Sequence, residues 1–241
     1  MKTKIKEFIF KDKNLGEYKF FIDSETFIPT QTTSAVINSS LPYIKKNEKV
    51  LDLGCGCGIV SIIISLLLDK KIDLYASDIS NSVVSIVKKN SEKYGVDIEV
   101  RKSDVFDAWE NNIFSTIIND ISGVSDEVAK ISPWFKNIAC DTGIGGDLLV
   151  NRVIKDAPNF LEKNGQLFFP VISLSNELSI LGNASQVFRS VEQVAKVYWP
   201  APKEMLSNID QLRELKNKGY ITFEEKFGSL ICFTSVYRAN L

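Results

Sequence analysis

Short apolar runs alternate with segments of helical periodicity along most of the chain from residue 49 onward. The apolar runs predict buried strands at 49–53, 72–77, 97–102, 114–119 and 166–171. Among the segments between them, 59–68 is apolar on all sides and predicts a buried helix. Because strands that alternate with helices form parallel sheets covered on both faces, we expect a doubly wound α/β fold.

Residue types typical of helix ends set the limits of two further helices. Ser80 and Gly95 begin and end the segment 80–95, in which apolar residues recur at helical spacing. We expect Asp147 to cap another helix, whose buried side is Leu148, Val150, Val153, Ile154 and Ala157. An amphipathic stretch, 33–44, predicts one more helix before the first buried strand.

The two ends of the chain depart from this alternation. Two short aromatic strands around the turn 12–16 predict an N-terminal β-hairpin. We therefore expect a hairpin extension over residues 1–28 and one α/β domain over 29–241. The C-terminal segment predicts a helix near 203–217 and late strands with an antiparallel edge, joined by a tight hairpin at 227–229.

Composition restricts the chemistry that the chain can perform. It has 241 residues, 44% of them hydrophobic, which is enough for one ordinary core. The net charge is −1, so no strong overall field attracts nucleic acid. Because there is no His, a Ser-His-Asp triad and a His-ligated metal are excluded, and no metal site is expected. A general acid or base must be Asp, Glu, Lys, Tyr or Cys.

The cysteines and the termini favour a cytoplasmic protein. Cys55 and Cys57 form C-x-C, which lacks zinc-finger spacing, and we expect the four cysteines to be buried residues of a reducing compartment. The N-terminal residues contain no apolar run typical of a signal peptide. The longest apolar stretch, 59–68, is about half as long as a membrane span.

A glycine-rich loop follows the first buried strand, where the sequence reads VLDLGCGCGIVSI. Gly54, Gly56 and Gly58 allow a sharp turn and let a ligand approach main-chain N–H groups. Asp78 ends the next strand, where a carboxylate of a doubly wound fold binds ribose hydroxyls. Ile59 replaces the last glycine of the dinucleotide motif, which disfavours NAD and leaves a nucleoside derivative as the expected ligand. A tight turn without a ligand is the alternative.

Residues 50–59 resemble motif I of class I S-adenosylmethionine-dependent methyltransferases, h-h-D-h-G-x-G-x-G. The resemblance implies a mostly parallel, seven-stranded, Rossmann-like sheet and S-adenosyl-L-methionine as cofactor. In that family the glycine loop holds the methionine part of the cofactor and an acid in the place of Asp52 helps to hold its amino group. The remaining implied contacts are ribose to Asp78, and adenine to Ile79, Asp104 and Val105.

The nearest branch of that family is similar to the HemK-type protein glutamine methyltransferases. The segments 27–33 (FIPTQTT) and 143–154 (GIGGDLLVNRVI) resemble segments of that branch. The N-P-P-Y motif of the branch is absent, because Asp120-Ile121-Ser122-Gly123 stands in its place. This difference disfavours methylation of glutamine amides and of adenine or cytosine amines.

Residues at the acceptor position have a functional and a structural interpretation each. Asp120 is the candidate catalytic and substrate-binding residue, as a proton or hydrogen-bond acceptor, and capping of the next turn is the alternative. Asn119 takes its place if the strand is one residue shorter. Ser122 is expected to line the acceptor pocket. Trp134 either forms an aromatic wall of that pocket or packs its loop against the sheet.

Three functions are compatible with these features. The first is an active methyltransferase that acts on a small molecule or a protein side chain. The second is a nucleic-acid methyltransferase acting on rRNA, which the pI of about 5.7 disfavours. The third is a non-catalytic S-adenosylmethionine-binding domain that works by interaction. No membrane partner is expected, and the oligomeric state is left open.

Overall fold

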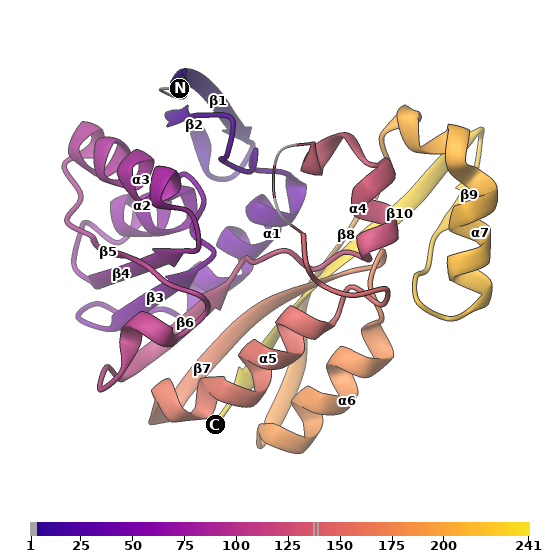
Figure 1. The fold of residues 1–241 in the computed structure, drawn as a ribbon. Helices are drawn as coiled ribbons and strands as arrows, with labels where there is room; N and C mark the ends of the chain where they lie inside the picture. The colour runs from indigo at the N-terminus through magenta and orange to yellow at the C-terminus, as the bar shows by residue number, and fades with distance from the viewer. Residues whose placement is uncertain (1–3, 137, 139) are drawn as a thin grey trace.

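The computed structural model describes residues 4–136, 138 and 140–241. One twisted sheet forms the centre of the molecule, and helices cover both of its faces (Figure 1). The order of its strands is β5-β4-β3-β6-β7-β10-β8, with β9 paired to β10. The strands are β3 (Lys49–Leu53), β4 (Asp73–Asp78), β5 (Glu99–Lys102), β6 (Phe114–Asn119), β7 (Leu161–Ile172), β8 (Ser190–Pro200), β9 (Glu224–Lys226) and β10 (Ser229–Asn240).

The sheet is parallel from β5 to β7 and antiparallel at β10. The carboxyl ends of β3, β4, β5 and β6 therefore meet at one edge. The seven strands that the family resemblance implies are present, and the three residues of β9 add an eighth. The expected tight hairpin is confirmed, since Phe227 and Gly228 both have positive φ and connect paired β9 and β10.

The helices are α1 (Gln31–Ser40), α2 (Ile59–Leu67), α3 (Asn81–Tyr94), α4 (Asp126–Ile131), α5 (Leu148–Asp156), α6 (Glu177–Val187) and α7 (Ile209–Asn217). One core cluster packs α1, α2 and α3 on one face of the sheet, and a second packs α5 and α6 on the other. A third cluster joins α4, α7 and the end of β8 around the fully buried Met205. Within the described ranges, no helix is both long and apolar enough to cross a membrane.

Local chemistry explains the limits of α3. The Ser80 hydroxyl accepts hydrogen bonds from the N–H groups of Ser82 (3.2 Å) and Val83 (3.4 Å), which begins the helix. Gly95 ends it in the left-handed conformation, with φ of 58°. Both ends of the helix agree with the sequence expectation. Residues on α3 also contact the N-terminal hairpin and hold it against the domain.

The hairpin consists of β1 (Lys6–Asp12) and β2 (Gly16–Ile22) and packs on α3. The Asn90 amide pairs with the backbone N–H and C=O of Phe21, at 2.7 and 2.9 Å. Phe10, Phe20 and Ile22 are buried in the core cluster that contains α2. The division at residue 28 remains our proposal, and residues 1–3 of the extension lie outside the described part.

Two expectations about α5 were wrong. Asp147 stands at the N-cap position but makes no capping hydrogen bond, because its carboxylate accepts from Asn151 Nδ2 (3.1 Å) and Ser179 Oγ (2.5 Å) instead. Leu148 is 63% exposed rather than buried, because the first turn of α5 projects over the carboxyl edge of the sheet. The other four residues of the expected buried side are buried.

Candidate active site

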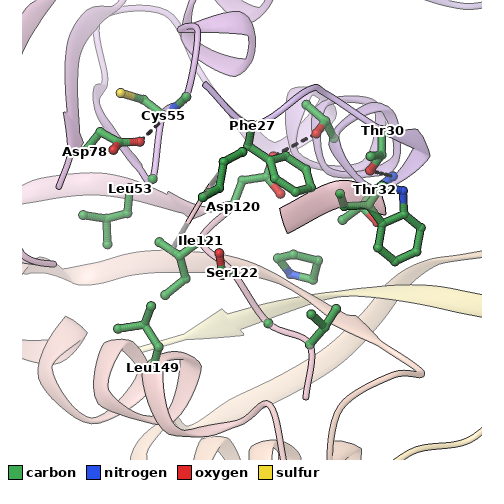
Figure 2. A pocket seen from close by; sticks show the side chains of 18 of the residues that line it. Phe27, Thr30, Thr32, Leu53, Cys55, Asp78, Asp120, Ile121, Ser122 and Leu149 are labelled. Carbon is green, nitrogen blue, oxygen red and sulfur yellow. Dashed lines mark hydrogen bonds between the residues drawn. The ribbon is translucent and has the colours of Figure 1, made fainter. Parts of the chain in front are cut away.

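A cavity of about 700 Å³ opens at the carboxyl ends of the parallel strands (Figure 2). Its lining comes from the glycine loop, the ends of β4 and β6, the first turns of α1 and α5, and the ends of β7 and β8. Ligands of open α/β sheets bind at this edge. The cavity therefore contains most of the residues that the sequence pointed to.

The glycine loop turns because two of its residues have no side chain. Gly54 has φ of +72°, and a Cβ there would stand 2.6 Å from Ile121 Cγ2. Gly56 has φ of +50°, and a Cβ there would meet no atom within 4 Å. Gly54 thus permits close packing of β3 on the loop after β6, whereas Gly56 leaves open space at the cavity wall. Gly58 caps α2 with φ of 80°.

Asp78 connects the end of β4 to this loop. Its carboxylate accepts hydrogen bonds from Gly56 N (3.2 Å) and Ser80 N (3.0 Å), and it lines the cavity (Figure 2). Burial raises its pKa above the ordinary aspartate value, while these two N–H donors act in the opposite direction. The carboxylate thus lies where the sequence analysis expected it.

Asp52 lies behind the loop and not among the residues that line the cavity. Its side chain is fully buried, and Oδ2 accepts from Ser61 Oγ (2.7 Å) and Ser61 N (3.2 Å). Oδ1 has no hydrogen-bond partner among the described residues. Burial raises the pKa of Asp52 to about 6, despite the lowering effect of both Ser61 donors.

Asp120 follows β6 and faces the cavity beside α1. Thr33 Oγ1 donates a hydrogen bond to Asp120 Oδ2 at 3.1 Å, and the backbone N–H of Asp120 donates to Leu53 O at 3.0 Å. Burial, together with the charge of Asp52, raises the pKa of Asp120 to about 7. A carboxylate with this pKa is able to accept a proton near neutral pH.

Asn119, the alternative to Asp120, is fully buried and does not line the cavity. Its Oδ1 accepts a hydrogen bond from Ile121 N at 3.4 Å. Asn119 therefore supports the turn after β6, whereas the carboxylate of Asp120 bonds to Thr33 of another element. The structure brings Asp120, and not Asn119, into the candidate site.

The three residues that the resemblance assigns to adenine lie together at one end of the cavity. Ile79 is 63% exposed and Val105 is 8% exposed, and both line the wall near Asp104. Asp104 accepts from Arg152 Nη1 at 2.8 Å, and Arg152 also reaches Asp107 at 3.5 Å. The sequence analysis missed Arg152, although Leu148 and Arg152 are one helical turn apart and share the cavity face of α5.

The opposite end of the cavity has aromatic walls. Ser122 and Trp134 both line it, and the Trp134 ring meets the Trp199 ring edge-on at 5.7 Å. Phe27 packs on Phe135 with ring centroids 5.3 Å apart. Trp134 thus lines the cavity and also packs against the end of β8, and its role toward an acceptor stays a prediction.

The charges of the side chains that line the cavity can be compared with those of S-adenosylmethionine. Its described lining includes the carboxylates of Glu25, Asp78, Asp104, Asp120 and Asp141. Arg152 is the one basic side chain in that described lining, and Asp104 and Asp107 already neutralise it. A ligand with a sulfonium and an ammonium group supplies the missing positive charge. The open wall at Gly56 and the ribose-type acid Asp78 fit the same ligand.

Comparison with known proteins finds similarity to methyltransferases. Residues 30–120 match the family model described as Methyltransferase small domain. A candidate protein N5-glutamine methyltransferase of Methanocaldococcus jannaschii is 26% identical over 190 residues, which are 79% of this chain and 94% of that protein. The ribosomal protein L11 methyltransferase of Thermotoga neapolitana is 34% identical over 135 residues, 50% of this chain and 47% of the relative. The chain therefore spans about half of this second relative.

A solved structure confirms the fold. The Thermus thermophilus 16S rRNA N2 G1207 methyltransferase, in complex with AdoMet and guanosine, superposes with a TM-score of 0.59 at 12% identity. The match covers 96% of this chain and 50% of that one.

The fold is that of class I methyltransferases, and residues 30–120 match the family model of the Methyltransferase small domain. More particularly, the chain is similar to S-adenosyl-L-methionine-dependent methyltransferases, the candidate glutamine methyltransferase among them, in agreement with the sequence motifs. The departure from that branch at Asp120-Ile121-Ser122-Gly123 is a property of this chain.

The buried charge of Asp52 predicts a pH dependence of stability. Its pKa is about 6 in the folded protein and about 4 when unfolded, so the folded state binds the extra proton between these values. The free energy of unfolding should therefore fall as pH rises from about 4 to about 6. Asp52→Asn removes this loss of stability. The free energy of unfolding of the variant, relative to that of the wild type, should therefore rise by on the order of 2–3 kcal/mol between about pH 4 and about pH 6.

Urea unfolding at pH 4.5 and pH 7.5 measures this difference. Asp73→Asn, at an exposed position of β4, is the matched control and should follow the wild type. An Asp52→Asn curve that runs parallel to the wild type across pH would show that Asp52 does not hold a raised pKa.

Proposed function

We propose that this methyltransferase transfers a methyl group from S-adenosylmethionine to a nucleophilic atom of a small molecule or a protein side chain. The observation that carries the proposal is that the glycine loop, Asp78 and Asp120 all line one cavity. The cofactor supplies an electrophilic methyl group when bound. The chain has to hold the acceptor atom about 3 Å from that methyl, in line with the leaving sulfur.

The cofactor roles proposed for individual residues follow from their positions. Asp78 would accept hydrogen bonds from the ribose hydroxyls, and Gly56 would let the methionine part approach the loop. Ile79 and Val105 would pack on adenine while Asp104 accepts from its amino group. Asp52 would act from behind the loop, through its charge, together with Gly54 and Gly58, which shape the bend.

The acceptor roles belong to the residues after β6 and to the loop at 132–135. Asp120 would take a proton or hydrogen bond from the acceptor, with Thr33 fixing one carboxylate oxygen. Ser122 and Trp134 would contact the acceptor body. Relatives are named for methylation of glutamine, ribosomal protein L11 and rRNA. Without N-P-P-Y, a planar amide is not the acceptor we favour.

A protein side chain or small molecule is favoured over nucleic acid by charge. The described lining is rich in carboxylates, which repel a phosphate backbone. We propose the cytoplasm as the location, because ribosomal protein L11, for which a relative is named, belongs to the translation machinery. Transfer of tritiated methyl groups into a cell lysate, separated into protein, RNA and small molecules, tests the proposal. Label in RNA alone would contradict it, and no label at all would favour the non-catalytic alternative.

Asp78→Ala should weaken cofactor binding because the ribose hydroxyls lose their acceptor. We expect a dissociation constant for S-adenosylhomocysteine raised by about 5- to 150-fold, which corresponds to 1–3 kcal/mol. Isothermal titration calorimetry measures the change. Asp97→Ala, an exposed acid before β5, should bind as wild type does. An unchanged constant in Asp78→Ala would exclude the ribose role.

Asp120→Asn should retain cofactor binding and lose turnover by about 10²- to 10⁴-fold, the usual contribution of a general base. In the wild type, kcat/KM should rise with pH toward a plateau above about 7, because the carboxylate form of Asp120 is the active one. A bound cationic cofactor moves that midpoint downward. The variant should lose this pH step. Turnover equal to that of the wild type would remove Asp120 from the mechanism.

A further inference from the structure

Strand order divides the cavity into two halves. The glycine loop, Asp78 and Asp104 stand over β3, β4 and β5, which form one side of the sheet. The other side, β6-β7-β10-β8, carries Asp120 and the aromatic end of the cavity. The proposed cofactor uses the first half. The second half is therefore free to define the acceptor.

The walls of this second half, which we call the acceptor chamber, are rich in rings. The ring-bearing residues among its lining are Phe27, Trp134, Phe135, Trp199, Pro200 and Pro202. Trp134 packs edge-on against Trp199, and Phe27 packs against Phe135, so each ring is held in place by its partner. The faces of aromatic rings carry negative electrostatic potential and attract cations. A chamber with these walls excludes water around whatever group enters it.

A chain of hydroxyl groups ties these rings to the carboxylate of Asp120. Trp199 Nε1 donates to Thr234 Oγ1 at 3.0 Å, and Thr234 Oγ1 lies 2.9 Å from Thr32 Oγ1. The next residue, Thr33, donates to Asp120 at 3.1 Å. Consecutive threonines in the first turn of α1 thus fix both an aromatic wall and the acid. The spacing between ring and carboxylate is built into the fold.

The charged side chains that line the acceptor chamber are acidic. Asp120 and Asp141 are acidic lining residues, and Arg152 is held at the adenine end by Asp104 and Asp107. An anionic acceptor is repelled here. A neutral alcohol or amide can donate a hydrogen bond to an acid here, but it lacks the charge that the rings and the acids attract. A cation is attracted by both, as electrostatic complementarity requires.

We infer that the methyl acceptor is an amine, which enters the acceptor chamber as an ammonium group between the aromatic rings and Asp120. The inference deepens the proposed function and rests on it. The body that carries the amine contacts Trp134 and Phe27, so it is apolar or flexible rather than a phosphate or a sugar. A primary amine of a small molecule and a lysine side chain share this chemistry.

The reaction balances without any further reagent. The ammonium group passes one proton to Asp120 and becomes a neutral amine with a free electron pair. The amine nitrogen forms a bond to the methyl carbon while the methyl–sulfur bond breaks and its electron pair stays on sulfur. The products are a methylammonium group and a neutral thioether nucleoside. The proton on Asp120 leaves to solvent when the product departs.

Three matched probes test the inference by binding alone. They are 4-phenylbutylamine, 4-phenylbutanol and 4-phenylbutanamide, which share one apolar body and differ in the terminal group. Each is titrated by calorimetry into the protein saturated with S-adenosylhomocysteine. We expect the amine to bind about tenfold more tightly than either neutral probe. Equal binding, binding of no probe, or a preference for the alcohol or amide overturns the inference.

Variants separate the two parts of the chamber. Asp120→Asn should remove most of the preference for the amine and leave alcohol binding within about threefold. Trp134→Leu should weaken amine binding about fivefold, and Trp134→Phe should restore it. Tyr198→Leu, an exposed aromatic position on β8 outside the cavity, is the control and should bind as wild type does. A loss of preference in the control alone would contradict the assignment.

Methyl transfer then identifies the source of the amine. The tritium-labelled cofactor is offered with 4-phenylbutylamine, with a blocked peptide containing one lysine, and with the same peptide containing glutamine. Label in either amine supports the inference and distinguishes a small molecule from a protein side chain. Label only in the glutamine peptide, or in none of the three, overturns it. Failure of S-adenosylhomocysteine to bind would instead overturn the proposed function.

Discussion

The site depends on a crowding of carboxylates that the fold leaves without matching cations. Asp52, Asp78 and Asp120 come from adjacent strands, near or just after the ends of β3, β4 and β6, and burial raises the pKa of each. Asp52 raises the pKa of Asp120, and Asp78 raises that of Asp52. A folded protein tolerates such repulsion where binding compensates for it. A methyl donor with a sulfonium and an ammonium group brings positive charge to this crowded edge.

Two short segments far apart in sequence place these carboxylates beside the cavity. The bend at Gly54 packs β3 against Ile121, which brings the turn after β6 to the cavity. The first turn of α1 closes the cavity from above, where Thr33 holds one oxygen of Asp120. The same turn contacts β10 through Thr32 and Thr234. The cofactor half and the acceptor chamber are thus connected through α1 rather than through the sheet alone.

Local chemistry made much of the fold predictable from the sequence. The strands β3 and β6 and the helix between Ser80 and Gly95 have the expected limits, because apolar runs and capping residues act over a few positions. The sequence did not predict α6, because its apolar stripe is weak: Leu178 is 84% exposed and only Ile180 and Ala184 are buried. The positions of Asp78 and the glycines were predictable for the same local reason. The contacts of Asp120 with Thr33, and of Asp104 with Arg152, join residues too distant in sequence for any pattern to show.

The position of β10 between β7 and β8 affects the order in which the two halves of the sheet gain their strand pairings. The strands β3 to β6 pair with one another and follow in sequence, so all of their mutual partners have been synthesised before β7. The neighbours of β10 are β7 and β8, and neither completes its pairing before β10 has been synthesised. During synthesis, the strands under the proposed cofactor half therefore have their partners available before those under the proposed acceptor chamber do.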